Sequence, residues 1–320
     1  MLRVFSNHEL LPAEWSSHSD PALTRIFNPG LMRDGAGWLL AYRSVGEPDQ
    51  HRRIALCRLN EEFEVVAGTA VPFSDQIRFE QPELYPAQAT TWFADPRLYR
   101  LQGRCFVYWN SGWHEPRNAQ FLQEFDPVTL CPVGAPRELT LWGARQKLEK
   151  NWALFEHGGD VFAVYSVNPH RVMTASLAGH GAIEFADVGQ PVANAGGYAK
   201  ANGGLRGGSP PVRQGESYVS FCHSIENDPQ GYRYVAAVYR FAATPPFLPL
   251  QLPAQPLPLA IPESARRKLP KLNPAVGEVV YVSGAAWHDG RWVISFGIDD
   301  ERCAIATLSD AEVRATLQTG

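Results

Sequence analysis

Polar side chains that could do chemistry recur in groups along this chain of 320 residues. A carboxyl such as Asp95 can donate or accept a proton, whereas lysine and arginine can hold an anionic group such as phosphate. The residues that could act together are Asn28, Arg43, Asp95, Arg97, Asn110, Lys150, Asn151, Arg206, Ser209, His223, Asp299 and Asp300. Whether they meet depends on the elements that carry them.

Most of these residues fall at corresponding places in five segments that share one plan: residues 27–43, 93–110, 150–166, 206–223 and 282–300. Each segment has a polar or glycine-rich start, a short apolar strand, a turn and a second strand that ends in aromatic residues. The turns contain Gly or Asp-Gly, which supplies the positive φ that tight hairpins need. Each hairpin is followed by two further strand-like runs, so one unit contains four strands.

Repetition of four-stranded units predicts an all-β fold, and specifically one five-bladed β-propeller domain over residues 1–320. Amphipathic helix patterns are almost absent, which argues against a βαβ fold. We expect the N-terminal strand at residues 2–6 to pair with the last blade and close the ring, or to pack beside it. The proline-rich stretch 245–262 is interpreted as an outer edge strand plus a surface loop, with a docking site as the alternative.

In a propeller the first strand of each blade lines the central channel, so polar groups from five repeats would converge there. A buried ion costs several kcal/mol unless it is paired, which favours a wet, functional funnel. The alternative is structural: Asp95 could cap backbone amides in a turn, Arg97 could bridge two blades, and Lys150 and His223 could be satisfied inside the protein. The recurrence at equivalent positions favours the funnel.

Composition and motifs exclude several functions. The formal net charge of −4 gives no reason to expect nucleic acid or an anionic membrane as partner. No apolar run approaches the roughly 20 residues of a membrane span, and the N-terminus lacks a signal-peptide core, so we predict a cytoplasmic protein. The sequence has no P-loop, no zinc motif and no G-x-S-x-G around Ser209. We therefore expect neither a metal nor an organic cofactor, and a calcium ion in the channel is the remaining alternative.

The cysteines and the tryptophans could each have either a structural or a functional role. The five cysteines are widely spread without a C-x-x-C pair, so buried reduced thiols are expected. Tryptophans either fill the core between sheets or stack on sugar faces at a funnel mouth. We expect most to be core, with Trp113 and Trp152 the better candidates for a sugar platform. The basic run 266–268 is interpreted as a solvated loop, or as a rim that attracts a phosphorylated ligand.

An ordered series of motifs resembles a known family. The series is Phe27-Asn28-Pro29, Asp95-Pro96-Arg97, Lys150-Asn151, Gly207-Gly208-Ser209-Pro210-Pro211, Cys222-His223 and Gly297 followed by Asp299. It resembles the five-bladed propeller enzymes of glycoside hydrolase family 130, and is similar to the β-1,2-mannosyltransferases and mannoside phosphorylases of glycosyltransferase family 108. The resemblance covers nearly the whole chain, with one motif per blade in the same order.

The resemblance implies roles for individual residues. Asp95 would be the general acid that acts on β-mannosides with inversion, partly through a sugar-hydroxyl relay. Lys150, His223 and Arg117 would bind phosphate, and Asp299 or Asp300 would hold the sugar hydroxyls. The chain departs from the family at Ala94, where the family usually has an acidic residue.

The balance of charges distinguishes the possible reactions. An inverting hydrolase needs an acid and a separate base, roughly 6.5 to 9.5 Å apart, to activate water. A phosphorylase or transferase instead needs cations for an anionic co-substrate. Cations are numerous among the candidates, which favours an anionic co-substrate: inorganic phosphate, a sugar 1-phosphate or a nucleotide sugar. Together with the resemblance, this implies a mannosyltransferase or a mannoside phosphorylase. The alternatives are an inverting glycoside hydrolase and a non-catalytic glycan-binding propeller, which Ala94 would suit.

Overall fold

The computed structural model describes residues 1–16, 20–46, 50–143, 145–192, 198, 202–228 and 231–319. β-Strands dominate its secondary structure, which confirms the predicted all-β class. The helices of these residues are single short turns: α1 (Asn7–Leu10), η1 (Ala13–Trp15), α2 (Phe73–Gln76), η2 (Pro82–Leu84), α3 (Ala87–Thr91), η3 (Glu263–Ala265) and α5 (Asp310–Arg314). Within the described ranges, none of the helices combines the length and the apolar character that crossing a bilayer requires.

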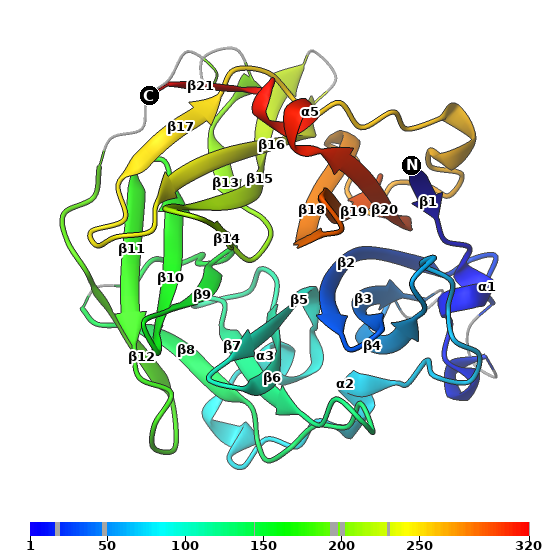
Figure 1. Cartoon of the computed structure of the whole chain (residues 1–320). Helices are drawn as coiled ribbons and strands as arrows, with labels where there is room; N and C mark the ends of the chain where they lie inside the picture. Colours follow the sequence, from blue (N-terminus) through cyan, green and yellow to red (C-terminus); the bar gives the residue numbers. More distant parts are fainter. Residues whose placement is uncertain are drawn as a thin grey trace.

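Antiparallel pairing divides the strands into five consecutive groups (Figure 1). The first contains β2 (Arg25–Asp34), β3 (Gly37–Val45) and β4 (Arg52–Leu59). The second contains β5 (Ala94–Leu101), β6 (Arg104–Asn110), β7 (Gln120–Phe125) and β8 (Arg137–Leu141), and the third β9 (Ala153–His157), β10 (Asp160–Val167), β11 (His170–Ala175) and β12 (Ile183–Asp187). The fourth contains β13 (Leu205–Gly207), β14 (Val212–Gln214), β15 (Ser217–Asp228), β16 (Gly231–Ala242) and β17 (Pro249–Pro253). The fifth contains β18 (Val276–His288), β19 (Arg291–Ile298), β20 (Arg302–Ser309) and β1 (Leu2–Val4).

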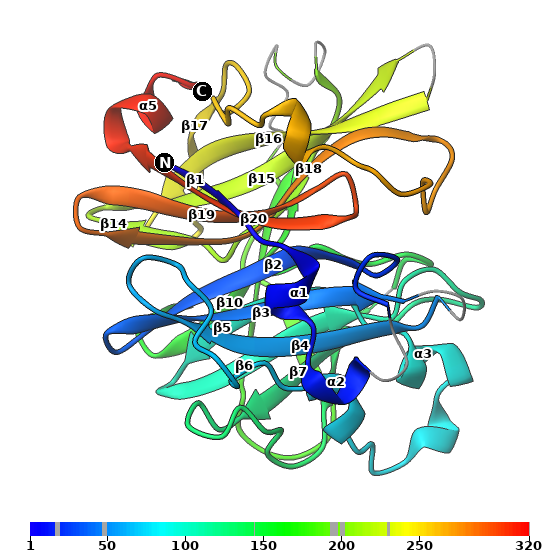
Figure 2. The ribbon, with the colours of Figure 1, turned by 90° about the vertical axis from the view of Figure 1, so that its right-hand side faces the viewer.

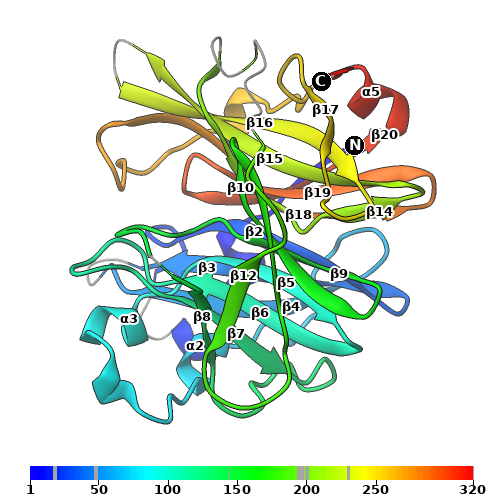
Figure 3. The ribbon, with the colours of Figure 1, turned by 90° about the vertical axis from the view of Figure 1, so that its left-hand side faces the viewer.

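Each of the five predicted hairpins is present as an antiparallel pair, namely β2–β3, β5–β6, β9–β10, β14–β15 and β18–β19. The N-terminal strand β1 pairs antiparallel with β20, as predicted, and Leu2 lies opposite Ala306. Parallel pairs between β8 and β12 and between β16 and β18 join neighbouring groups. Figure 2 shows β18–β20 and β1 as one layer over β2–β4, and Figure 3 shows β10 and β12 running between β5–β8 and β15–β16.

The proline-rich stretch differs from the prediction in two respects. Its strand β17 pairs with β16 on one side, but the short C-terminal strand β21 (Leu317–Thr319) pairs with its other side, so β17 is not a free edge. The loop after β17 is more than a surface loop, because Leu257 is buried and Leu259 and Ile261 pack against the core between the fourth and fifth groups. The apolar residues between the prolines explain this burial.

The first strands of the five groups, or the residues next to their ends, contact one another in the cyclic order β2, β5, β9, β13, β18 and again β2. Glycines permit four of these contacts, because a Cβ atom would collide with the neighbouring backbone. The β5–β9 contact is a hydrogen bond from Arg97 Nη1 to the Trp152 carbonyl at 2.7 Å, at the start of β9. The glycine contacts are Gly30 with Arg97, Gly207 with Asn151, Gly208 with Val282 and Gly284 with Leu31.

Two of these first strands contain a bulge at which an Asn or Asp is followed by proline. The pairing register is interrupted between Phe27 and Gly30 in β2, and between Ala94 and Arg97 in β5. Asn28 and Asp95 have φ angles of 53° and 55°, in the left-handed region that Asn and Asp tolerate better than other non-glycine residues. The bulges take both side chains out of the ladder and let them meet.

Large aromatic residues fill the spaces between the sheets. Trp38, Trp109, Trp152 and Trp292 are fully buried, and Trp152 packs against Tyr165 and Phe185. This burial excludes Trp152 as a sugar platform, whereas Trp113 is 56% exposed and stays a candidate. Four cysteines are free and buried, as predicted, and the fifth, Cys131, is half-buried.

The close approach of β18 to β2 generates a stability prediction. A Cβ atom on Gly284 would lie 2.4 Å from the Leu31 backbone nitrogen, so we expect Gly284→Ala to lower the free energy of unfolding by about 2 kcal/mol or more. Urea denaturation monitored by circular dichroism measures this as a lower midpoint. The matched control is Gly204→Ala, where an added Cβ meets nothing within 4 Å. Equal midpoints for the two variants would contradict the packing of these first strands.

Candidate active site

Asp95 is the centre of a polar cluster at the start of β5. It is buried, and its Oδ1 accepts a hydrogen bond from Asn28 Nδ2 at 2.8 Å and forms an ion pair with Arg43 Nη1 at 3.4 Å. Asn110 Nδ2, at the end of β6, donates to the other carboxyl oxygen at 3.5 Å. Burial would raise the pKa of the Asp95 carboxyl, but Arg43, Lys150 and the Asn28 amide outweigh burial and lower it. Asp95 is therefore ionised at neutral pH despite its burial.

Lys150 and Arg206 bring positive charge to the same cluster. Burial lowers the pKa of Lys150, the negative charges of Asp95 and Asp300 oppose this, and the nearby Arg206 and Arg43 lower it further. Across the part of the chain that the structure describes, neither the Lys150 ammonium nor the Arg206 guanidinium has a carboxylate within ion-pair distance. Two neighbouring cations without a carboxylate partner repel each other and favour a bound anion.

His223, on β15, is fully buried beside these cations. Its ring lies 4.6 Å from that of Tyr281, and among the described residues neither ring nitrogen has a hydrogen-bond partner. Burial lowers the pKa of His223 well below its usual range, and the charges of Arg97, Lys150 and Arg206 add to this. The imidazole is therefore neutral, so it could donate one hydrogen bond and accept one, but it would not act as a phosphate-binding cation.

Asp300, in the turn after β19, is the second carboxyl of the cluster. It is half-buried and has a φ angle of 56°. Burial raises the pKa of Asp300 to about 6, Arg43 and Lys150 oppose the rise, and the negative charges of Asp95 and Asp299 add to it. Asp95 and Asp300 are thus neighbouring carboxyls with pKa shifts in opposite directions, which is the arrangement from which acid and base roles arise.

Two acidic residues hold Asp300 in place from either side. Asp299 accepts hydrogen bonds from the backbone N–H groups of Val279 at 2.8 Å and Arg267 at 3.2 Å. Glu301, also buried, accepts from the backbone N–H groups of Lys268 and Leu269. Asp299 is therefore occupied inside the protein, and of the predicted pair only Asp300 is available to a ligand.

The basic run 266–268 is anchored rather than loose. The Arg266 guanidinium pairs with Asp299 at 3.4 Å and with Glu278 at 3.3 Å, and the backbone of the next residues is bound by the acidic turn. The run of acids at 299–301 was the signal in the sequence that could have indicated this anchoring. Glu301 is the residue of the turn that the sequence analysis missed.

Three predicted binding residues are used within the protein. Arg97 is completely buried and donates to the Trp152 and Gly207 carbonyls and to the Asn151 side chain. The Asn151 Oδ1 also accepts a hydrogen bond from the Tyr281 hydroxyl at 2.6 Å. The Ser209 hydroxyl accepts from the Phe221 N–H and donates to the Pro210 carbonyl. For these residues the structural alternative is the better description, and Arg97 acts as a bridge between the first strands.

Arg117 does not join the cluster. It is exposed, in the loop after β6, and lines a cavity of about 580 Å³ together with Tyr85, His114, Glu138 and Lys147. The resemblance placed it as a phosphate-binding cation beside Lys150. The path of this loop is not determined by strand periodicity, so its distance from Asp95 could not be judged from the sequence.

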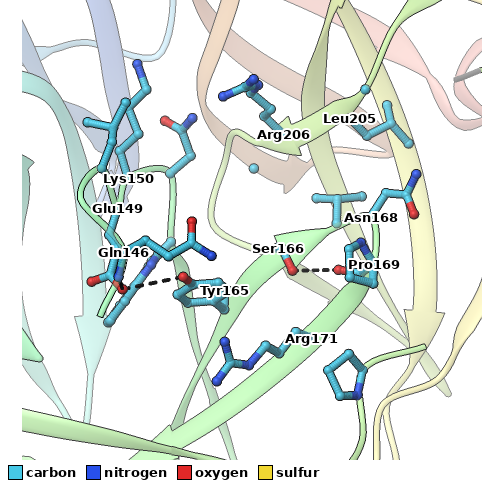
Figure 4. A pocket seen from close by; sticks show the side chains of 17 residues that line it. Gln146, Glu149, Lys150, Tyr165, Ser166, Asn168, Pro169, Arg171, Leu205 and Arg206 are labelled. Carbon is cyan, nitrogen blue, oxygen red and sulfur yellow. Dashed lines mark hydrogen bonds between the residues drawn. The ribbon is translucent and has the colours of Figure 1, made fainter. Parts of the chain in front are cut away.

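A cavity of about 480 Å³ opens beside Lys150 and Arg206 (Figure 4). It lies between the segment that leads into β9, the β10–β11 turn and β13. In this view Lys150 and Arg206 lie on one side of the cavity, and Tyr165, Ser166 and Arg171 lie on the opposite side. Lys150, whose charge interacts with those of Asp95 and Arg206, therefore lies both in the cluster and at the edge of a space of ligand size.

Solved structures with this fold come from the families that the sequence resembles. A structure from the GH130 family of mannoside phosphorylases and glycoside hydrolases is 12% identical, with a TM-score of 0.65, and the match covers 90% of this chain and 85% of that chain. A β-1,2-mannobiose phosphorylase from Listeria innocua is 14% identical, with a TM-score of 0.63 and 98% of each chain covered. A GDP-Man-dependent mannosyltransferase from Leishmania mexicana is 13% identical, with a TM-score of 0.54, and 91% of this chain and 86% of that chain are covered. No protein-family model and no curated protein matches the sequence. At these identities the likeness shows a shared fold.

The raised pKa of Asp300 generates a pH-dependent stability prediction. Because the folded state favours the protonated carboxyl, Asp300 stabilises the protein below the pKa of the unfolded chain, and this contribution is lost as the pH rises through about 6. We expect Asp300→Asn to increase the free energy of unfolding by about 1 to 3 kcal/mol at pH 8 and by much less at pH 4. Urea denaturation at both pH values measures the difference.

The control is Asp160→Asn, which removes a carboxyl from an exposed position at the start of β10. It should change the free energy of unfolding little at either pH. A loss of stability at pH 8 in Asp300→Asn would contradict the account of this carboxyl.

Proposed function

We propose that the chain is a single five-bladed β-propeller domain that transfers a mannosyl group, with inversion, between an anionic phosphate-bearing compound and a sugar hydroxyl. The observation that carries the proposal is a buried, ionised Asp95 beside Lys150 and Arg206, two cations without a carboxylate partner within the described ranges. The cyclic contact of the first strands and the shared fold of mannoside phosphorylases support it. The expected partner is a carbohydrate, and the predicted cytoplasmic location and absence of a resident cofactor remain predictions.

The charges suggest how the groups divide the work. In the transfer direction the C1–O bond to phosphate breaks, and the phosphate leaves with the electron pair, its charge stabilised by Lys150 and Arg206. The acceptor hydroxyl forms the new C1–O bond from the opposite face of the sugar, and its proton passes to the Asp95 carboxylate, directly or through a sugar hydroxyl. In the reverse direction, which is phosphorolysis, the protonated Asp95 returns that proton to the leaving oxygen.

Asp300 has a different part in this proposal. A carboxyl with a pKa of about 6 is partly protonated near neutral pH and can donate a hydrogen bond to a sugar hydroxyl as well as accept one. The neutral His223 can likewise donate to a phosphate oxygen from the buried end of the site. These contacts would orient the sugar and the phosphate while Asp95 handles the proton.

An inverting glycoside hydrolase is the second candidate, and the pair of carboxyls supports it. Hydrolysis needs one carboxyl to protonate the leaving oxygen and another to activate water, and Asp95 and Asp300 have pKa shifts in opposite directions. The two candidates differ in their need for phosphate. A hydrolase releases mannose from a β-mannoside in phosphate-free buffer, whereas a phosphorylase does not.

A product screen tests the proposal. Mannose 1-phosphate and GDP-mannose are offered as donors to a panel of acceptor sugars, and β-mannosides are incubated with and without inorganic phosphate. We expect a β-mannoside product from one donor, or phosphate-dependent release of mannose 1-phosphate. Phosphate-independent release of mannose would establish the hydrolase instead, and binding of sugar without any product would establish a glycan-binding protein.

Replacement of the central carboxyl tests its role. We expect Asp95→Asn to lower kcat by about a hundredfold to ten-thousandfold, because proton transfer by a positioned side chain contributes a factor of that order. Asn can still accept the hydrogen bonds of Asn28 and Arg43, so the circular dichroism spectrum should be unchanged. Asp160→Asn is the control and should keep full activity. Unchanged turnover in Asp95→Asn would remove Asp95 from the mechanism.

A further inference from the structure

The cavity beside Lys150 and Arg206 is lined by both polar and apolar residues, and its charge is unevenly distributed (Figure 4). Its near end carries the Lys150 ammonium and the exposed Arg206 guanidinium, which have no carboxylate within ion-pair distance in the part of the chain that the structure describes. The charge of Arg206 lowers the pKa of Lys150, which indicates that the two cations lie close enough to repel each other. An anionic group bound there would relieve this repulsion.

The far end of the cavity has no free charge of either sign among the lining residues. Arg171 forms a two-point ion pair with Asp187, at 2.5 and 2.8 Å. The Glu149 carboxylate is neutralised by Arg145 at 3.2 Å and accepts a hydrogen bond from the Tyr165 hydroxyl at 3.4 Å. A second anionic group would therefore find no available cation there, and an uncharged polar group fits better.

The size of the cavity bears on what the anion is attached to. Its volume of about 480 Å³ lies in the range of roughly 300 to 1,000 Å³ that is typical of sites for whole small molecules. Inorganic phosphate would occupy only the end at Lys150 and Arg206 and leave the space towards Tyr165 and Ser166 unused. The mannosyl group would lie on the other side of the phosphate, beside Asp95 and Asp300.

We propose that the anionic substrate is a phosphate or diphosphate esterified on both sides, with the mannosyl group beside Asp95 and an uncharged polar group, such as a nucleoside, in the cavity lined by Gln146, Tyr165, Ser166 and Gly204. The inference rests on the proposed function and selects transfer from such a donor over phosphorolysis by inorganic phosphate. The reaction is the one balanced above, with the departing phosphate ester retaining the uncharged group.

Two variants fill the cavity without removing a charged group. Gly204→Trp adds bulk at a lining position where a Cβ atom meets nothing within 4 Å and where φ is not positive. Gln146→Trp adds bulk at a second lining position, in the segment before β9. The matched control is Gly189→Trp, at an exposed position outside the lining, where the nearest atom to an added Cβ is 3.4 Å away.

Isothermal titration calorimetry with inorganic phosphate, mannose 1-phosphate and GDP measures the contribution of the cavity. We expect GDP to bind at least tenfold more tightly than inorganic phosphate to the unmodified protein and to Gly189→Trp. In Gly204→Trp and Gln146→Trp, GDP should lose at least tenfold in affinity while inorganic phosphate changes less than twofold. Thermal unfolding of each variant establishes that it is folded.

Lys150→Ala tests the anion site separately from the cavity that would hold the uncharged group. If GDP binds no more tightly than inorganic phosphate and Lys150→Ala weakens both, the anion site stands and the ester-binding cavity is wrong. If the filling variants leave GDP affinity unchanged, the cavity is likewise not where the uncharged group binds. If none of the three probes binds the unmodified protein, both the cavity and the proposed function are wrong.

Discussion

A carboxylate that stays ionised while buried requires cations and hydrogen-bond donors on several sides at once, and Asp95 is such a carboxylate. Burial favours its neutral form, so the charges of Arg43 and Lys150 and the Asn28 amide must outweigh the loss of hydration. The partners come from different parts of the chain: Asn28 from β2, Arg43 from β3 and Lys150 from the segment before β9. The ionised state of Asp95 thus depends on the cyclic arrangement of the first strands.

The same constraint explains local features that are costly by themselves. Asn28 and Asp95 adopt left-handed backbone angles inside strands, and the bulges that result turn both side chains out of the ladder. Arg97 gives its hydrogen bonds to neighbouring first strands and fills the space between them. Asp299 and Glu301 bind the backbone of 267–269 and leave Asp300 beside the cluster. Each of these features positions one polar or charged group of the cluster around Asp95.

The sequence indicated the repeat well because the signals of a hairpin are local. Asp34-Gly35 and Asp289-Gly290 each lie in a turn between paired strands, and the strands on either side follow from their apolar residues. Repeat position also brought Asp95, Lys150 and His223 together correctly. The sequence could not predict the charge state of the site, because the neutral form of His223 depends on its burial and on three nearby cations, two of them from other repeats.

Other site residues could not be assigned from the sequence because their partners are distant in it. Arg97 bonds to Gly207, and Asn151 bonds to Tyr281, so a polar residue at a binding position was indistinguishable from one used inside the protein. Asp299 and Asp300 are adjacent, and what distinguishes Asp299 is its bonding to the 266–267 segment and to the Val279 backbone. Arg117 lies in a loop, where no periodicity fixes position.

The central claim is that Asp95 is ionised because of the surrounding cations. A pH titration of the aspartate side-chain carboxyl carbons by ¹³C NMR measures the pKa of Asp95 directly. The Asp95 signal is assigned as the one that disappears in Asp95→Asn. The account predicts that Asp95 titrates below the usual range of an aspartate and that Lys150→Met moves its titration upwards. An Asp95 signal that titrates above the usual range in the unmodified protein, or that does not respond to Lys150→Met, would contradict the account.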